Sequence, residues 1–437
     1  MDMLVTNGVV VTMNKEMEII EDGAVYIKDG TIVQIDSKDR FSNIITEKTI
    51  DARGGIIMPG LINTHTHASM TLFRGLADDM PLMDWLNNHI FPAESKLTED
   101  MVYKGAMLAC AEMILSGTTC FCDMYLFENK VAEAAFDSGM RAVAGEVLYD
   151  FPSPCYGDLA KGFNYVSNMM EKWKNNSRIT IAAEPHSTYL CAPELLKRAA
   201  ATARENKSPI VIHLAETENE TALIKEKYGT TPVKFLADLG VLGPDLIACH
   251  CIHITEEDIQ LLKKFDVKVA HCPESNMKLG SGTAPVPELI KQGICVSLGT
   301  DGCASNNDLD LFLEMDTAAK LHKVFTMNPE AINAETALKM ATINGAATLG
   351  LDKITGSLEV GKKADIIVVD NSKPHMIPMY NPYSQLVYSA NGSDVSATII
   401  DGNLVMKDRK ILTMDIRKIM DDVKEISKII KKADNSV

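Results

Sequence analysis

Residues 59–67 read Pro-Gly-Leu-Ile-Asn-Thr-His-Thr-His, and this stretch decides how the rest of the chain is interpreted. A short apolar run leads into two histidines, His65 and His67, spaced two positions apart. On a β-strand this spacing points both imidazoles to the same side, because side chains alternate with a period of two. Two imidazoles at the end of a buried strand can bind a divalent metal ion. A single His-x-His also occurs by chance in loops, so the interpretation depends on the other strands.

The middle of the chain repeats one pattern, an apolar run followed by a helical stretch. Eight runs can be distinguished: 56–62, 118–124, 141–148, 179–185, 209–215, 246–252, 267–272 and 294–300. Strands that alternate with helices indicate parallel strands joined by helical crossovers. Eight such units predict an α/β fold, a (β/α)8 TIM-type barrel, whose functional side chains lie at the C-terminal ends of the strands.

Polar residues end nearly all of these runs, as a functional barrel requires. The strand-end residues are His65, His67, Asp123, Glu146, His186, His213, Glu216, His250, His271 and Asp301. Within this set, His65, His67 and His213 with Asp301 offer three imidazoles and one carboxylate, which suits a zinc-like ion and leaves a position for water. The other four histidines, on helical or loop stretches, are interpreted as surface or locally hydrogen-bonded residues: His89, His253, His322 and His375.

Both ends of the chain have a β pattern. Short alternating strands with Asp-Gly turns fill residues 4–50, and strand-like runs return at 364–369 and 397–406. We therefore predict a small β-sandwich domain built from residues 1–56 and 356–437, beside a catalytic barrel at 57–355. A charged helix is expected at 413–433.

Composition restricts the class of protein. The net charge is −16, from 59 acidic and 43 basic residues without a long basic run, which disfavours nucleic acid as a partner. The sequence holds no stretch of 18 apolar residues and does not start like a signal peptide, so we expect a cytoplasmic protein without a membrane partner. Five of the ten cysteines, Cys110, Cys120, Cys249, Cys251 and Cys295, lie in apolar runs, so reduced core thiols are predicted rather than disulfides.

Five motifs occur together and in order along essentially the whole chain. They are residues 59–67, His-Leu-Ala-Glu at 213–216, Gly-Thr-Asp-Gly at 299–302, Ser-Asn-Asn-Asp at 305–308 and Gly-Ser-Leu-Glu-Val-Gly-Lys-Lys-Ala-Asp at 356–365. This set resembles the amidohydrolase superfamily and, within it, the 5-methylthioadenosine/S-adenosylhomocysteine deaminases. The resemblance implies a hydrolase of C–N bonds in cyclic amidines. Its substrate would be a 6-aminopurine nucleoside such as 5-methylthioadenosine, S-adenosylhomocysteine, 5′-deoxyadenosine or adenosine, and its products the 6-oxo nucleoside and ammonia.

The resemblance also implies chemical roles. His65, His67, His213 and Asp301 match the ligands of one divalent metal ion per subunit, usually Zn²⁺, with Fe²⁺ or Mn²⁺ as alternatives. Such an ion lowers the pKa of water from ~15.7 toward ~7. Glu216 matches the residue that protonates N1 of the purine, and His250 one that hydrogen-bonds the attacking water. Asp301 would also carry the proton that leaves with ammonia.

Trp85 and Glu94 match positions that face the substrate in the resembling family. His186, which ends the fourth run, would contact the nucleoside, and Ser305 would support the same region. Glu216 would contact the purine as well. A carboxylate such as Glu94 can accept hydrogen bonds from two neighbouring ribose hydroxyls. For Trp85 the alternative is an anchor of its loop in the core.

One position departs from the family pattern. Many members carry an arginine after the third strand, whereas residues 144–154 read Ala-Gly-Glu-Val-Leu-Tyr-Asp-Phe-Pro-Ser-Pro, with Glu146 in that region. The loss of a cation there predicts that neutral 5′ groups bind better than the carboxylate tail of S-adenosylhomocysteine.

Two other functions fit parts of the pattern. An aminohydrolase acting on guanine, cytosine or an s-triazine would use the same metal ligands, although Trp85 and Glu94 favour a ribose-bearing substrate. A non-catalytic barrel scaffold would not need a general acid beside a metal site. The outer helices of such a barrel could support a homo-oligomer, and the sequence does not select a subunit number.

Overall fold

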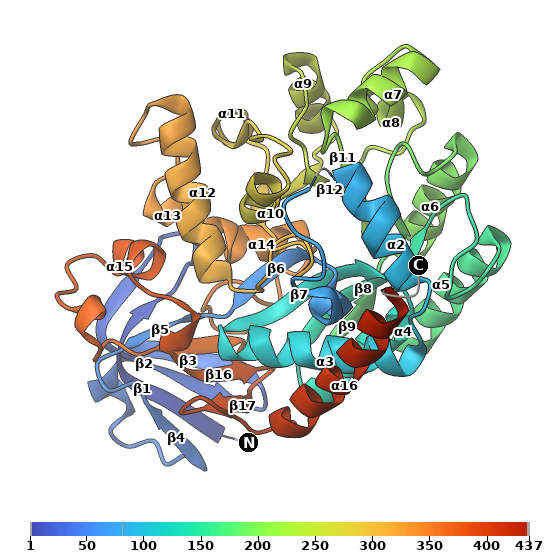
Figure 1. The fold of residues 1–437 in the computed structure, drawn as a ribbon. Helices are drawn as coiled ribbons and strands as arrows, with labels where there is room; N and C mark the ends of the chain where they lie inside the picture. The colour runs from blue at the N-terminus through green and yellow to red at the C-terminus, as the bar shows by residue number, and fades with distance from the viewer. Residues whose placement is uncertain (1, 81, 435–437) are drawn as a thin grey trace.

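The computed structural model describes residues 2–80 and 82–434, which form a barrel and a β-rich domain beside it (Figure 1). The β-rich domain combines both ends of the chain, and the barrel comes from the middle. This arrangement confirms the predicted TIM-type barrel with a β-rich domain from the termini.

The barrel strands are parallel and follow the chain in order. They are β6 (Leu61–Thr66), β7 (Thr118–Tyr125), β8 (Arg141–Leu148), β9 (Ile179–Ile181), β10 (Glu184–Pro185), β11 (Ile210–Leu214), β12 (Leu246–His250), β13 (Lys268–His271) and β14 (Val296–Leu298). Two backbone contacts join the halves into a closed ring. The N–H of Val211 donates to Ala183 at 3.2 Å, and the N–H of Asp301 donates to His65 at 3.0 Å.

Helices surround the strands (Figure 1). They are α1 (Leu82–Trp85), α2 (Phe91–Glu94), α3 (Glu99–Leu115), α4 (Glu128–Ser138), α5 (Leu159–Trp173), α6 (Pro193–Asn206), α7 (Glu218–Tyr228), α8 (Pro232–Asp238), α9 (Glu256–Lys264), α10 (Pro273–Lys278), α11 (Val286–Lys291), α12 (Leu311–Thr326), α13 (Ala334–Met340) and α14 (Ile343–Thr348). Local sequence explains their starts. Thr98 caps α3, Thr255 and Asp258 form a capping box on α9, and Pro193 occupies the first position of α6.

Two of the predicted strands are divided. The run 56–62 contains β5 (Ile56–Pro59), which pairs with the β-rich domain, and the start of β6 in the barrel. The break falls at Gly60, where an added Cβ would lie only 2.1 Å from Thr119, so the close approach of β7 requires glycine. The fourth run, 179–185, forms the short strands β9 and β10, which both pair with β8.

The β-rich domain is one continuous hydrogen-bonded sheet rather than two separate ones. Its other strands are β1 (Asp2–Val11), β2 (Ile19–Lys28), β3 (Thr31–Ser37), β4 (Lys48–Asp51), β15 (Ile366–Val369), β16 (Val395–Ile400), β17 (Asn403–Lys407) and β18 (Lys410–Ile411). The first half of β1 pairs with β4 and the second half with β5, which links the N-terminal strands to β15. Apolar side chains from both ends of the chain, including Val25, Ile27, Ile366 and Ile399, form its core.

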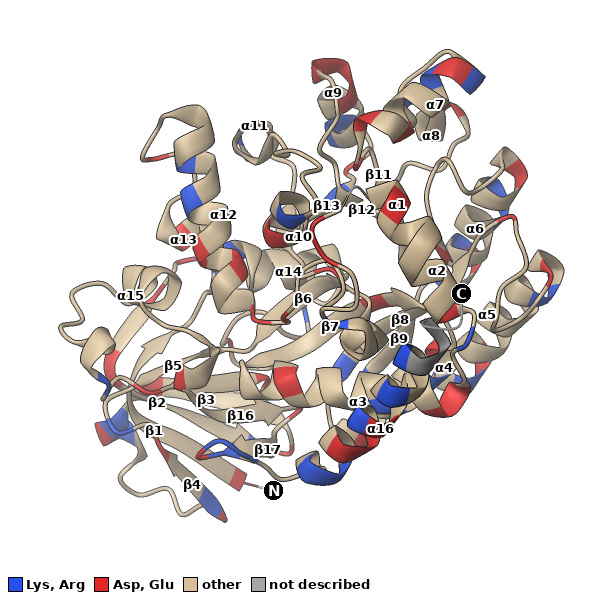
Figure 2. Ribbon diagram, in the orientation of Figure 1, with Lys and Arg blue, Asp and Glu red and all other residues tan. Residues whose placement is uncertain are grey.

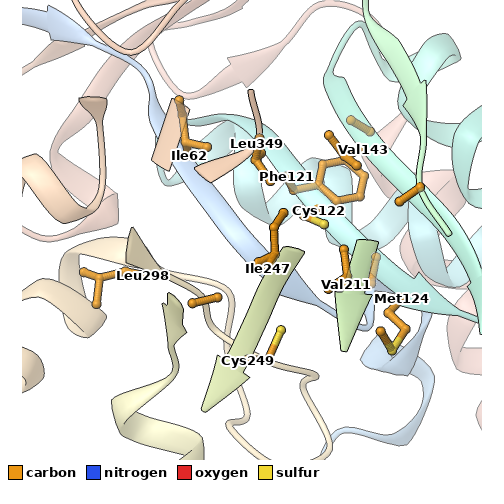
Figure 3. Close-up of a cluster of buried hydrophobic side chains, with 14 of the residues drawn as sticks. Ile62, Phe121, Cys122, Met124, Val143, Val211, Ile247, Cys249, Leu298 and Leu349 are labelled. Carbon is orange, nitrogen blue, oxygen red and sulfur yellow. The ribbon is translucent and has the colours of Figure 1, made fainter. Parts of the chain in front are cut away.

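A second, larger core fills the barrel and the layer between strands and helices. Figure 3 shows side chains from several barrel strands close together there, among them Ile62, Phe121, Val211 and Ile247, with Leu349 beside them. Charged residues lie mainly on the outer helices, and Lys/Arg and Asp/Glu are interspersed along α16 (Ile416–Asp434), which packs on α3 (Figure 2). The last helix therefore fixes the C-terminal segment to the outside of the barrel.

None of the helices that the structure describes combines the length and the hydrophobicity that a membrane crossing needs. All ten cysteines are free thiols, and eight of them are buried, which confirms the prediction of reduced thiols.

Candidate active site

The motif at 59–67 closes the barrel between its first and last strands. The side chain of Asn63 donates to the Thr300 hydroxyl at 2.8 Å and accepts from the Thr300 N–H at 3.1 Å. Thr64 donates to the carbonyl of Leu298 at 2.8 Å. These buried bonds hold β6 in register with the segment after β14, and Asp301 follows directly. The polar residues that precede His65 within β6 thus bring the carboxylate to the imidazoles.

Glycine is required on both sides of Asp301. A Cβ on Gly299 would lie 2.8 Å from the backbone N and the Cβ of His65, and one on Gly302 would lie 2.7 Å from Met70 Sδ and 3.1 Å from the Cβ of His67. Larger residues at either position would separate the last strand from the first. The Gly-Thr-Asp-Gly motif is therefore explained by close packing against the histidine strand.

The four predicted metal ligands converge on one point. Nε2 of His67 lies 3.4 Å from Nε2 of His213 and 3.0 Å from Oδ1 of Asp301, and Nε2 of His65 lies 3.6 Å from the same oxygen. Ligands at about 2.0–2.1 Å from a tetrahedral ion are roughly 3.4 Å apart, so these spacings fit a zinc-sized cation. His65 is fully buried, and neither ring nitrogen has a hydrogen-bond partner among the described residues. Burying an imidazole without a hydrogen-bond partner costs free energy, and a metal ion bound by His65 would compensate this cost.

Backbone carbonyls orient two of the imidazoles. Nδ1 of His67 bonds the carbonyl of Met124, and Nδ1 of His213 bonds the carbonyl of His186 at 2.8 Å. A carbonyl only accepts, so each Nδ1 carries a proton and each Nε2 is the nitrogen that faces the centre, where it can bind a metal ion once it is unprotonated. This arrangement prepares both rings for metal binding.

The electrostatics of the cluster follow from burial and from Asp301. Burial and the neighbouring imidazoles hold the pKa of His65 and of His213 well below the usual value. For His67, burial also lowers the pKa, but the hydrogen bond and charge of Asp301 outweigh it and raise the pKa to about 9. The same contact keeps the pKa of Asp301 low although burial opposes this. The carboxylate is thus ionised, as a metal ligand must be.

A pocket lies next to the ligand cluster, and its volume, including the open space at its mouth, is about 690 Å³. His67, His213 and Asp301 lie in its wall with Glu216 and His250, and Oε2 of Glu216 is 3.9 Å from Nε2 of His250. Apolar side chains make up much of the remaining wall: Met70, Leu82, Leu86, Phe91, Met124, Leu126, Val147 and Leu279.

The structure brings the four predicted substrate-facing residues to the same pocket. Trp85 is buried, and its indole N–H donates to the carbonyl of Ala77 at 3.2 Å, so it also anchors the first loop. Nδ1 of His186 has no partner in the described part of the chain. Burial raises the pKa of Glu94 to about 7, although the nearby Tyr125 hydroxyl and His67 lower it. Ser305 is 3.1 Å from Oδ2 of Asp301, so its hydroxyl is directed to the ligand set.

Glu146 does not line the pocket. Its side chain is fully buried and accepts the N–H of Glu128, the first residue of α4, at 2.8 Å. Its pKa is raised to about 8 because burial disfavours the charged form, against the hydrogen bond from Glu128. Glu146 therefore contacts the first turn of α4 and not the pocket, whereas the absence of an arginine in this region of the sequence is unaffected.

Two other strand-end residues also have structural contacts. Asp123 bonds the hydroxyl of Thr66 and accepts the N–H of Ala68 at 2.5 Å, which fixes the backbone on both sides of His67. Nε2 of His271 lies 3.1 Å from Nε2 of His322, so His322 is buried beside it rather than on the surface.

Several residues that line the pocket, or that contact Asp301 and His250, were not predicted from the sequence. Tyr125, Tyr149 and Tyr189 line the pocket, and Ser275 and Asn276 contact Asp301 and His250 from behind. The last two follow the seventh predicted strand, so the strand-end rule could have indicated them.

The backbone is strained at three strand ends. Ala215, His250 and Asp301 have φ values of +51°, +72° and +60°, in the left-handed region that costs a residue with a side chain about 1–3 kcal/mol. All three lie at or beside residues of the cluster. His250 and Asp301 line the pocket, and Ala215 lies between His213 and Glu216, which line it as well.

The amidohydrolase family matches residues 56–405, which include the barrel and every residue of the cluster. The chain belongs to the amidohydrolase family. A 5-methylthioadenosine/S-adenosylhomocysteine deaminase of Syntrophobacter fumaroxidans is 54% identical over 431 residues, covering 98% of each chain. A 5′-deoxyadenosine deaminase of Methanosarcina mazei is 46% identical over 428 residues, covering 97% of each chain.

The fold of this amidohydrolase is also found in a crystal structure of an adenosine deaminase from Xanthomonas campestris with bound zinc. The two chains superpose with a TM-score of 0.97 at 36% identity, over 99% of each. The family relationship and the cluster of imidazoles and carboxylate together indicate metal dependence.

Proposed function

We propose that this amidohydrolase removes the 6-amino group of an adenosine-type nucleoside by hydrolysis, releasing ammonia and the 6-oxo nucleoside. The observation that carries the proposal is the placement of Glu216 and His250 beside the three imidazoles and Asp301 in one pocket. The names of the relatives from Syntrophobacter and Methanosarcina support the nucleoside class.

One divalent ion per subunit would be held by His65, His67, His213 and Asp301, and we propose Zn²⁺ because the donor spacing suits it. Fe²⁺ and Mn²⁺ are the alternatives for the same donors. When bound, the ion supplies a water molecule whose pKa is lowered from ~15.7 toward ~7.

Three side chains would transfer or hold protons. Burial raises the pKa of Glu216, although the neighbouring His250 opposes this, so its carboxyl holds a proton more readily than a surface glutamate and can donate it to N1 of the purine. Asp301 would take a proton from the attacking water and return it to the departing ammonia. Nε2 of His250 would hydrogen-bond the oxygen that adds to C6.

The substrate would lie between the ligand cluster and the first loop. Glu94 would accept hydrogen bonds from the 2′- and 3′-hydroxyls of ribose, and Trp85 would form the wall beside it. His186 would contact the nucleoside through its free Nδ1. We propose a supporting role for Ser305 through Asp301, because its hydroxyl points there.

The pocket wall favours an uncharged 5′ group. No lysine or arginine is among the described residues that line it, whereas three carboxylates are: Glu94, Glu216 and Asp301. The carboxylate of S-adenosylhomocysteine would meet no compensating cation, so we expect 5′-deoxyadenosine and 5-methylthioadenosine to be better substrates.

Ammonia release from purified, metal-loaded enzyme tests the function. The panel contains 5′-deoxyadenosine, 5-methylthioadenosine, adenosine, S-adenosylhomocysteine, guanine, cytosine and an s-triazine. We expect activity with the adenosine-type compounds only, and kcat/KM at least about tenfold lower for S-adenosylhomocysteine, which corresponds to about 1.4 kcal/mol. Activity with only a free base or a triazine would contradict the proposal.

A scaffold without catalysis is tested by metal analysis. The enzyme should contain about one metal ion per chain, and removal by a chelator should abolish ammonia release until the ion is restored. A protein that binds no ion and stays inactive with zinc, iron or manganese would instead favour the scaffold.

A further inference from the structure

We propose that the short helix α10 positions the site, with Ser275 holding Asp301 and Asn276 holding His250. The chemistry of these two partners rests on the proposed function, whereas the contacts themselves do not. Both Ser275 and Asn276 are fully buried, so water does not compete for their contacts with Asp301 and His250.

The contact with Ser275 gives the two carboxylate oxygens of Asp301 different hydrogen-bond partners. Its hydroxyl donates to Oδ2 of Asp301 at 2.7 Å and lies 3.1 Å from the hydroxyl of Ser305, which contacts the same oxygen. The other oxygen, Oδ1, faces the imidazoles and accepts the N–H of Gly302 at 2.8 Å. The carboxylate therefore cannot rotate without losing hydrogen bonds on both oxygens.

Asn276 fixes the ring of His250. Its side-chain oxygen lies 2.9 Å from Nδ1 of His250, so Nδ1 carries the proton as donor. The opposite nitrogen, Nε2, is buried, lies 3.9 Å from Glu216 and has no hydrogen-bond partner within residues 2–80 and 82–434. Asn276 thus leaves the lone pair of Nε2 directed into the pocket.

The sheet order explains why one helix serves both partners. β13 lies between β12, which ends at His250, and β14, which leads to Asp301. α10 follows β13 after a single residue, with Pro273 at its first position. Successive residues on a helix point about 100° apart, so Ser275 and Asn276 reach the two neighbouring strands from the middle one.

Ser275→Ala tests the first contact. We expect kcat to fall about 10- to 100-fold, as for other groups that orient metal ligands, with KM within about twofold and metal content unchanged. Ser138→Ala is the matched control, because Ser138 is also buried but donates to the carbonyl of Ala135 in its own helix. Equal kcat values in the two variants would overturn the role of Ser275.

Asn276→Ala and Asn276→Asp test the second contact. We expect alanine to lower kcat about 10- to 100-fold at little change in KM, and aspartate, which keeps an acceptor at the same place, to restore at least about a tenth of the wild-type rate. Asn344→Ala, which removes a side chain that donates to the carbonyl of Val296, is the control for loss of a structural asparagine. An aspartate variant no better than alanine would overturn the role.

Nitrogen NMR of ¹⁵N-histidine-labelled, metal-loaded enzyme separates this proposal from the proposed function. We expect His250 to carry its proton on Nδ1 in the wild type and in Asn276→Asp, and to lose this preference in Asn276→Ala. A wild-type His250 protonated on Nε2 alone would overturn the role of Asn276, even if the enzyme deaminates adenosine. The expected spectra from an enzyme inactive on every nucleoside would contradict the function and support the positioning.

Discussion

The two ends of strand β8 differ in whether the buried charged and polar groups around them have partners. At its first residue, the guanidinium of Arg141 donates to both oxygens of Asp365, at 2.9 and 3.3 Å, and to the carbonyl of Ser177 at 2.8 Å. Asp365 also accepts the N–H of Asp401 at 2.6 Å. This buried network joins the bottom of the barrel to the β-rich domain, and both of its charges are paired.

At the mouth of the barrel, buried polar atoms lack such partners. Both ring nitrogens of His65, Nε2 of His250, Nδ1 of His186 and Oε1 of Glu146 are unsatisfied among the residues described. Leaving a buried polar group unpaired costs about 1–3 kcal/mol. Paired charge at the bottom stabilises the fold, whereas unpaired groups at the mouth are available to a metal ion, a substrate or a proton. TIM barrels divide stability and function between these same two ends.

Removal of His213 should have the largest effect. His213→Ala takes away one of the proposed ligands, so the metal ion and activity should be lost together, with kcat/KM down about 10⁴-fold or more, equivalent to about 5.5 kcal/mol. The measurements are metal per chain and ammonia release. The apo variant should unfold close to the apo wild type, because outside the ligand cluster the ring of His213 makes a single hydrogen bond, to the carbonyl of His186, among the described residues. Full metal occupancy in the variant would contradict the proposed ligand set.

Removal of Arg141 should lower the stability of the fold and leave the catalytic rate nearly unchanged. Arg141→Met leaves Asp365 as an unpaired buried charge, which costs about 3–5 kcal/mol of unfolding free energy. Denaturant unfolding measures the loss, and kcat per folded molecule should stay within about twofold. Adding Asp365→Asn to Arg141→Met should recover part of the stability. A large loss of kcat at full folding would mean that the bottom of the barrel does not act through stability alone.

Strand and helix alternation was sufficient to predict the barrel, because each strand is an apolar run that ends in a polar residue. The ligand positions were also predictable, since the C-terminal ends of parallel strands meet at one edge. His65, His67, His213 and Asp301 come together as this rule requires. The paired termini followed from their shared β pattern.

Other features depend on packing that periodicity does not contain. The direction of Glu146 is set by the N-terminus of α4, which the strand pattern alone does not place. The burial of His322 results from its contact with His271, 51 residues away along the chain. Asp365 belongs to a recognisable motif, but its partner Arg141 stands 224 residues earlier, and no local pattern connects them.

Glu216→Gln separates proton transfer from metal binding at the mouth. Glutamine keeps the size of the side chain but cannot donate the acidic proton, so kcat should fall about 10²-fold or more, equivalent to about 2.7 kcal/mol. Metal content and the unfolding midpoint should stay close to wild type. A rate near that of the wild type would require another group to protonate the ring.

The smallest effect should come from Glu146→Gln, which tests whether an unpaired carboxyl at the mouth costs stability. The pKa of Glu146 is about 8 in the folded protein, above the value of about 4.5 expected when unfolded, so the folded state binds the proton more tightly. This carboxyl therefore favours folding below about pH 4.5 and loses that contribution as the pH rises to about 8.

Glutamine cannot ionise and keeps an oxygen that accepts the N–H of Glu128. The variant should therefore be close to the wild type in stability near pH 5 and be the more stable of the two near pH 8.5, where the wild-type carboxyl is ionised in the folded protein. Thermal unfolding at the two pH values measures the difference, with Glu133→Gln as a control, because Glu133 is paired with Lys130 and Lys172 and its pKa is lowered. If Glu146→Gln were destabilising at both pH values, the carboxylate would have a stabilising partner, and the contrast between the two ends of β8 would be weaker.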